Sequence, residues 1–258
     1  TLSNEVSAIA GNTSSDEKPL VGKTVFLAGD SRSSTDYNFY GTTLANKTGA
    51  NVLVQGASGW TTAQIASNAY FERITANPHD YIIFLIAGND MGTAGTVGTL
   101  ATGTPNQLSG ETVVAETDIS VDYNGTKLVQ AISHIIRKYQ KTYGDFRANA
   151  GLTGSETESE KEAILDAQRK PKLIFCTDIP QQRADAGNPW SLKANWERKN
   201  KAILECCEKY NVTVLDLYNL CKFDMTKEPF YNSPTDKVTN NGLYYMDGLH
   251  PNKYGIDV

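Results

Sequence analysis

The chain has 258 residues, of which 40% are hydrophobic and 21% are charged, and this balance predicts a single globular domain. The formal net charge is −5, and lysine and arginine are scattered along the chain, so no nucleic-acid partner is expected. No apolar run approaches the roughly 20 residues that a membrane-spanning helix needs. The four cysteines show no C-x-x-C or Cys/His metal spacing, which predicts reduced, buried thiols and no metal site.

Residues 1–22 are polar and rich in serine and asparagine, and we expect a linker or the end of a preceding module there. The sequence begins at Thr1 without the basic and apolar pattern of a signal peptide, so we expect a processed or excised fragment. Residues 23–258 are expected to form the folded domain, with residues 91–125 and 144–170 as insertions.

The first predicted strand ends in a possible nucleophile. Residues 23–31 read KTVFLAGDS, a β-branched and aromatic run that stops at Gly29 and then presents Asp30 and Ser31. In an open parallel α/β sheet the carboxyl ends of the strands form the ligand-binding edge. Ser31 is therefore a candidate nucleophile, although Gly-Asp-Ser is also an ordinary turn sequence.

Two further predicted strands end in the same way. A helix over residues 39–48 leads to a strand over 50–55, which is followed by a loop with Gly56 and Gly59 and then by a predicted helix over 62–73. Backbone amides in such a loop can donate to an approaching oxygen, unless the loop is only a glycine-rich turn.

The third strand, over residues 79–87, is a continuous apolar run that ends in Gly88-Asn89-Asp90. The Asn89 amide can donate to a developing oxyanion or can form an Asx turn.

The second half of the chain continues the alternation of helices and strands. Residues 91–125 form a long Gly- and Thr-rich excursion suited to covering a substrate, with a small hairpin or cap expected over 112–123. The remaining predicted elements are a helix over 124–143, a short helix over 159–169, a strand over 172–177, a helix over 192–210 and a strand over 212–217. Five strands separated by helices predict a parallel sheet with helices on both faces.

A base candidate follows from the three histidines of the chain. His79 precedes a strand, and His134 is expected on the surface of the helix over 124–143 rather than as a base. By elimination His250 is the candidate base, and Asp247, three residues earlier, can orient its ring. Taken alone, Asp-x-x-His-Pro can also be a capped turn.

Taken together, the four segments resemble the SGNH or GDSL family of serine esterases. Gly29-Asp30-Ser31, Gly56-x-x-Gly59, Gly88-Asn89-Asp90 and Asp247-x-x-His250-Pro251 occur in the order of that family's four blocks. The resemblance implies a flavodoxin-like, three-layer α/β/α fold and hydrolysis of an O-acyl ester through an acyl-enzyme. It also implies a triad of Ser31, Asp247 and His250, and an oxyanion hole made by the amides of Ser31 and Gly59 and the side chain of Asn89.

The substrate is less constrained by the sequence. Arg32 stands where the family more often has a small or apolar residue, and we expect it, with Trp60 and Asp90, to contact the substrate. Aromatic side chains and the polar loop after Asn89 favour a carbohydrate ester, with removal of acetyl groups as the leading hypothesis and with no metal or cofactor.

Two alternatives stay open. One is a lysophospholipase or thioesterase, and the other is a non-catalytic glycan-binding module of a larger surface or virion assembly. A secreted, cell-surface or virion-associated location is slightly favoured over the cytoplasm.

Overall fold

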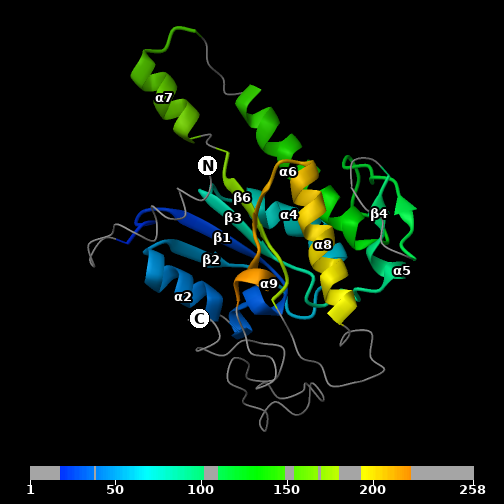
Figure 1. Ribbon diagram of the computed structural model, residues 1–258. Helices are drawn as coiled ribbons and strands as arrows, with labels where there is room; N and C mark the ends of the chain where they lie inside the picture. Colours follow the sequence, from blue (N-terminus) through cyan, green and yellow to red (C-terminus); the bar gives the residue numbers. More distant parts are fainter. Residues whose placement is uncertain are drawn as a thin grey trace.

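The computed structural model describes residues 18–37, 39–101, 110–148, 154–167, 170–179 and 193–221 (Figure 1). Its centre is a five-stranded parallel sheet with the strand order β2-β1-β3-β6-β7. The strands are β1 (Thr24–Gly29), β2 (Asn51–Val54), β3 (Tyr81–Leu85), β6 (Lys172–Cys176) and β7 (Thr213–Leu215). The predicted α/β fold class with five parallel strands is confirmed.

Helices cover both faces of this sheet, as the alternation of predicted elements indicated (Figure 1). One face carries α2 (Phe39–Thr48) and α9 (Leu217–Leu220), whose residues Tyr40 and Leu217 pack with Ile179. The other face carries α3 (Thr62–Ile65), α4 (Asn68–Thr75), α6 (Leu128–Ala148) and α8 (Lys193–Lys209). Two 3₁₀ turns, η1 (Ser31–Ser33) and η2 (Thr35–Tyr37), follow β1 directly.

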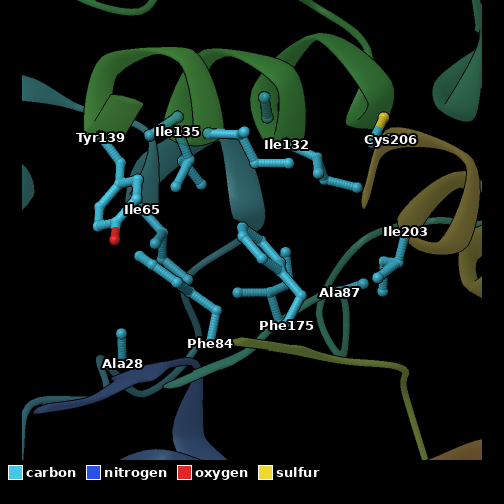
Figure 2. Packing of buried hydrophobic residues seen from close by; sticks show 14 of the residues in the cluster. Ala28, Ile65, Phe84, Ala87, Ile132, Ile135, Tyr139, Phe175, Ile203 and Cys206 are labelled. Carbon is cyan, nitrogen blue, oxygen red and sulfur yellow. The ribbon is translucent and has the colours of Figure 1, made fainter. Parts of the chain in front are cut away.

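The core lies between one face of the sheet and the helices α6 and α8 that cover this face. Because side chains alternate along a strand, residues at matching register positions form rows on one face, and Phe84 pairs in register with Ala28 on β1 and Phe175 on β6. Figure 2 shows Ile132 and Ile135 of α6 pointing down from the helix toward this row. The rings of Phe84 and Phe175 stack with centroids 5.0 Å apart, so aromatic packing joins β3 to β6 within this layer.

The structure departs from the expected elements between residues 62 and 75. The single helix expected over 62–73 is two helices, α3 and α4, because Ser67 starts a new helix and its hydroxyl accepts from the amide of Tyr70.

The excursion after β3 also differs from its prediction. It contains α5 (Ala94–Val97) and a second, two-stranded sheet of β4 (Thr99–Leu100) and β5 (Val113–Val114). These strands are parallel, so of the two forms expected over 112–123, a small hairpin or a cap, the hairpin is not formed, and this segment supplies one strand of a parallel pair.

His134 is the third difference. Instead of lying on the helix surface, it is 0% exposed, and its Nδ1 lies 2.8 Å from the hydroxyl of Thr117. The chain segment after β5 therefore covers this side of α6.

The two ends of the insertion over 144–170 are helical: α6 runs on to Ala148, and α7 (Glu158–Ala167) stands away from the sheet in Figure 1. Residues 1–17 and 222–258 lie outside the described part of the chain, and with them lie Asp247 and His250. Among the described helices, none has the length and apolar character needed to cross a bilayer.

Candidate active site

The turn that carries Ser31 is built by close packing at the end of β1. Gly29 has φ +143°, and a Cβ atom at this position would lie 1.9 Å from the carbonyl oxygen of Leu85 on β3. The next amide, that of Asp30, donates to this same oxygen at 3.2 Å. Ser31 then begins η1, with Asp30 as its N-cap, and is 7% exposed. The glycine is therefore required because only a residue without a side chain lets β1 turn this close to β3.

The second glycine loop lies directly against the Ser31 turn. The amide of Gly56 donates to the carbonyl of Ser33 at 2.8 Å, and the amide of Ala57 donates to the carbonyl of Gly29 at 2.8 Å. A Cβ atom on Gly56 would lie 2.2 Å from the carbonyl carbon of Ser33, so this glycine is needed for contact between the loops.

Gly59 differs from Gly56 in each of these respects. It is exposed and has φ +78°, a Cβ atom built on it would have no atom of the described residues within 4 Å, and its amide donates to none of those residues. A positive φ favours glycine, and an amide without a protein partner can donate to a ligand. The amide of Gly59 is thus placed where a ligand can reach it, and its role as the oxyanion donor of this loop stays a prediction.

The third segment reaches the second through Asn89. Its Nδ2 atom donates to the carbonyl of Trp60 at 3.0 Å. A carboxamide nitrogen has two N–H groups, so this bond fixes the side chain and leaves one N–H to donate elsewhere. The segments that contain Ser31, Gly59 and Asn89, which are distant in the sequence, are thus joined by hydrogen bonds at one edge of the sheet.

The side chain of Arg32 does not lie where the sequence suggested. It is buried beneath the turn, where it bonds both carboxylate oxygens of Asp30 and also pairs with Asp178. Burial lowers the pKa of Arg32, but the two carboxylates raise it by more than burial lowers it. The net shift of the pKa is therefore upward, and the guanidinium is charged. The structure therefore corrects the expectation of a substrate contact: Arg32 faces the protein interior and has its hydrogen-bond partners there.

Asp90 is placed beside the loop that precedes α3. Its Oδ2 accepts from the amide of Thr62 at 2.9 Å and from the hydroxyl of Thr62 at 2.8 Å, so it stabilises the start of that helix. Burial raises the pKa of Asp90, against the opposing effect of the bonds from Thr62. Trp60 is half-buried, with its ring 6.0 Å from that of Tyr70.

A cavity of about 370 Å³ opens next to Asn89. Six of its ten lining residues are polar and four are apolar. The polar residues are Thr61, Asn89, Asp90, Thr96, Thr126 and Lys127, and the apolar residues are Ala63, Met91, Val97 and Leu128. The excursion after β3 therefore borders the site, because it supplies Met91, Thr96 and Val97.

The two described histidines lie away from this edge. His79 precedes β3, at the end of the strand opposite to Asn89, and His134 lies on α6. Burial lowers the pKa of both imidazoles, which keeps them neutral near pH 7. The assignment of His250 as the base, oriented by Asp247, stays a prediction.

Comparison with known proteins identifies the family of the chain. The family model described as "GDSL-like Lipase/Acylhydrolase family" matches residues 26–258. The chain belongs to this family. It is accordingly a hydrolase that acts on esters. No curated protein matches the chain.

Solved structures of similar fold come from several bacteria. The crystal structure of a protein from Lactobacillus plantarum is 18% identical, with a TM-score of 0.54 and coverage of 91% of each chain. The structure of a protein described as a GDSL-like lipase from Parabacteroides merdae is 13% identical, with a TM-score of 0.49 and coverage of 93% of each chain. At these identities the Lactobacillus protein supports the three-layer fold of this GDSL-family chain and nothing finer.

Two buried residues near the site were not identified from the sequence. Asp178 lies two residues after the end of β6, and Lys199 lies on α8; both form ion pairs in the charged layer under the Ser31 turn. The sequence contains a signal for Lys199, since it shares a helical face with the buried residues Trp196 and Ile203.

Proposed function

We propose that this chain is a serine esterase that removes short O-acyl groups, O-acetyl above all, from a carbohydrate through an acyl-enzyme on Ser31. The observation that carries the proposal is the hydrogen-bonded meeting of the Ser31 turn, the Gly59 loop and Asn89 at the carboxyl edge of the sheet. This arrangement supports the proposal, because acyl transfer requires a hydroxyl nucleophile and N–H donors at one place.

Each residue has a stated role in the proposed reaction. His250, oriented by Asp247, takes the proton of the Ser31 hydroxyl as that oxygen attacks the ester carbonyl, and then gives the proton to the leaving alkoxide. The amides of Ser31 and Gly59 and the second N–H of Asn89 stabilise the oxyanion of the tetrahedral intermediate. In the second half of the reaction His250 takes a proton from water as the water attacks the acyl-enzyme, and then gives the proton to the Ser31 oxygen as the acid leaves.

The preference for a small acyl group on a polar carrier rests on the cavity beside Asn89. A long acyl chain gains about 0.8 kcal/mol for each methylene that reaches an apolar wall. Although most of the exposed surface of this cavity is apolar, the charged residues Asp90 and Lys127 are among its lining residues, and a long chain lying against them would deprive them of water. The hydroxyl groups of a sugar can bond to the threonine hydroxyls of the lining, whereas the ring of Trp60 lies against Tyr70 and beneath Arg73 rather than on the cavity wall.

The test compares p-nitrophenyl acetate with p-nitrophenyl octanoate by kcat/KM. We expect the acetyl ester to be turned over faster by at least tenfold, and Ser31→Ala to lose turnover of both while keeping its melting temperature. Full activity in Ser31→Ala would end the serine-esterase mechanism. An octanoyl preference would instead favour the lysophospholipase or thioesterase alternative, for which Met91, Val97 and Leu128 are the apolar wall.

A further inference from the structure

Four charged side chains form a buried cluster under the strand ends: Asp30, Arg32, Asp178 and Lys199. Each side chain is 1% exposed, and the two negative and two positive charges balance. Arg32 bonds Asp30 and Asp178, and Lys199 bonds Asp178 at 2.8 Å. The cluster connects the ends of β1 and β6 to α8, which lies beside β6 in Figure 1.

The cluster also bonds three consecutive residues of the chain at the end of β3. Arg32 Nη2 donates to the carbonyl of Ile86 at 3.1 Å, and Lys199 Nζ donates to the carbonyl of Ala87 at 2.7 Å. The amide of Gly88 donates to Asp30 Oδ2 at 3.0 Å. The next residue along the chain is Asn89.

Ala87 needs such support. Its φ is +71°, a left-handed conformation that residues with a side chain rarely adopt. Strained backbone persists where its surroundings hold it in place, and here the carbonyl of Ala87 is bonded by the ammonium of Lys199. The conformation of Ala87 sets the direction in which the chain leaves β3, and so it sets the position of Asn89.

A role in folding alone accounts poorly for this arrangement. Buried ion pairs are weak contributors to stability compared with well-packed apolar groups. In this cluster, moreover, three bonds that involve charged groups go to the peptide groups just before Asn89 rather than to other charges.

We propose that Lys199 is a positioning residue for ester hydrolysis: by holding the Ala87 carbonyl, it directs the second N–H of Asn89 at the oxyanion. The proposal rests on the function proposed above, because it needs Asn89 to donate in the transition state. Lys199 itself touches no reacting atom. Its effect therefore passes through Asn89, and this is the property that an experiment can isolate.

The experiment is a double-mutant cycle measured with p-nitrophenyl acetate. We expect Lys199→Met to lower kcat by roughly 10- to 100-fold with little change in KM, since misplaced catalytic groups lose rate on this scale. In the Asn89→Ala background the same substitution should lower kcat less than twofold. The matched control is Lys209→Met, a paired lysine on the same helix whose partner is Glu116, and it should leave kcat unchanged.

A second variant guards against loss of folding. Asp178→Asn/Lys199→Met removes one charge of each sign and leaves the Asp30–Arg32 pair, so the cluster stays neutral. It should fold, as judged by a cooperative melting transition, and should show the same dependence on Asn89.

Three results would overturn the positioning role. These are an unchanged kcat in folded Lys199 variants, equal losses with and without Asn89, and failure of the charge-balanced variant to fold, which would assign the cluster to stability. The proposed function is judged separately, because Ser31→Ala and Asn89→Ala test it without any change at Lys199.

Discussion

Removing the guanidinium of Arg32 should destabilise the fold strongly. In Arg32→Met the side chain keeps much of its length, but Asp30 and Asp178 lose the cation that pairs with both. Lys199 then remains as the only positive charge of the cluster, against two carboxylates. All three groups stay buried, so water cannot replace the lost partner.

The size of the effect follows from this burial. Breaking a buried ion pair from one side costs about 3 to 5 kcal/mol, because an uncompensated charge is left in the interior. Domains are stable by about 5 to 15 kcal/mol in total, so this loss is a large share. At about 2 to 4 °C for each kcal/mol, the melting temperature of Arg32→Met should fall by roughly 6 to 20 °C.

The loss should also depend on pH, with a definite sign. In the wild-type protein burial raises the pKa of Asp178, but Arg32 and Lys199 lower it by more than burial raises it. The net shift of the pKa is therefore downward. Asp178 therefore stabilises the fold above the ordinary carboxyl pKa, and this contribution is lost as the pH falls through its folded pKa. Without Arg32 the pKa of Asp178 rises, so the carboxylate takes up a proton at a higher pH, and the variant then no longer carries an unpaired buried charge there. The difference between the two proteins should shrink from about pH 7 to pH 5.

Guanidinium chloride unfolding at pH 7 and at pH 5 measures the loss of stability in Arg32→Met and the change of this loss with pH. The control is Arg73→Met, since Arg73 is exposed and lies over the rings of Trp60 and Tyr70, and it should cost about 1 kcal/mol or less. If Arg32→Met lost less than about 1 kcal/mol at pH 7, or lost more at pH 5 than at pH 7, the account of the buried cluster would be refuted.

Three further predictions concern the site. Asn89→Ala should lower kcat about 100-fold or more, because one oxyanion donor contributes about 3 kcal/mol; a change below threefold would remove Asn89 from the oxyanion hole. The pH profile of kcat/KM should rise with a midpoint near about 6.5 as His250 loses its proton, and His134→Gln should keep that midpoint, whereas a flat profile with chemistry rate-limiting would count against His250. Gly88→Ala should destabilise the fold by about 1 to 3 kcal/mol, because its Cβ would lie 2.5 Å from the guanidinium of the buried cluster. Gly95→Ala is its control in denaturant titrations, with 4.0 Å to the nearest atom, and equal losses in the two variants would contradict the steric reasoning.

The elements that the sequence predicted well are those set by short-range signals. The strands over 24–29, 81–85 and 172–176 are apolar runs that end at glycine or at a polar residue, and they were located to within a few residues. Because parallel strands bring their carboxyl ends to one edge, a sheet predicted to be parallel was enough to expect the segments after β1 and β3, with Ser31 and Asn89, at the same edge.

The elements that were missed depend on contacts between distant segments. The pairing of β4 with β5 joins residues on either side of a connecting segment, and no local pattern marks it. His134 has the sequence context of an exposed helical residue, and its burial depends on the segment around Thr117 folding over α6. Propensity and periodicity describe one element at a time, so they do not report which neighbour will cover it.

Arg32 illustrates the same limit inside the candidate site. Next to a nucleophile, an arginine can face the substrate or the layer beneath the turn, and the local sequence does not distinguish the two. The choice is made by Asp178, 146 residues further along the chain, whose carboxylate bonds the guanidinium at the end of β6. A lysine on the apolar face of α8 was the available clue, because a buried cation requires a buried anion, and the carboxyl end of a neighbouring strand is where one would lie. A charged residue on the apolar face of a predicted helix therefore indicates that a partner of opposite charge is buried nearby, and a charged residue beside the nucleophile can belong to the same buried cluster.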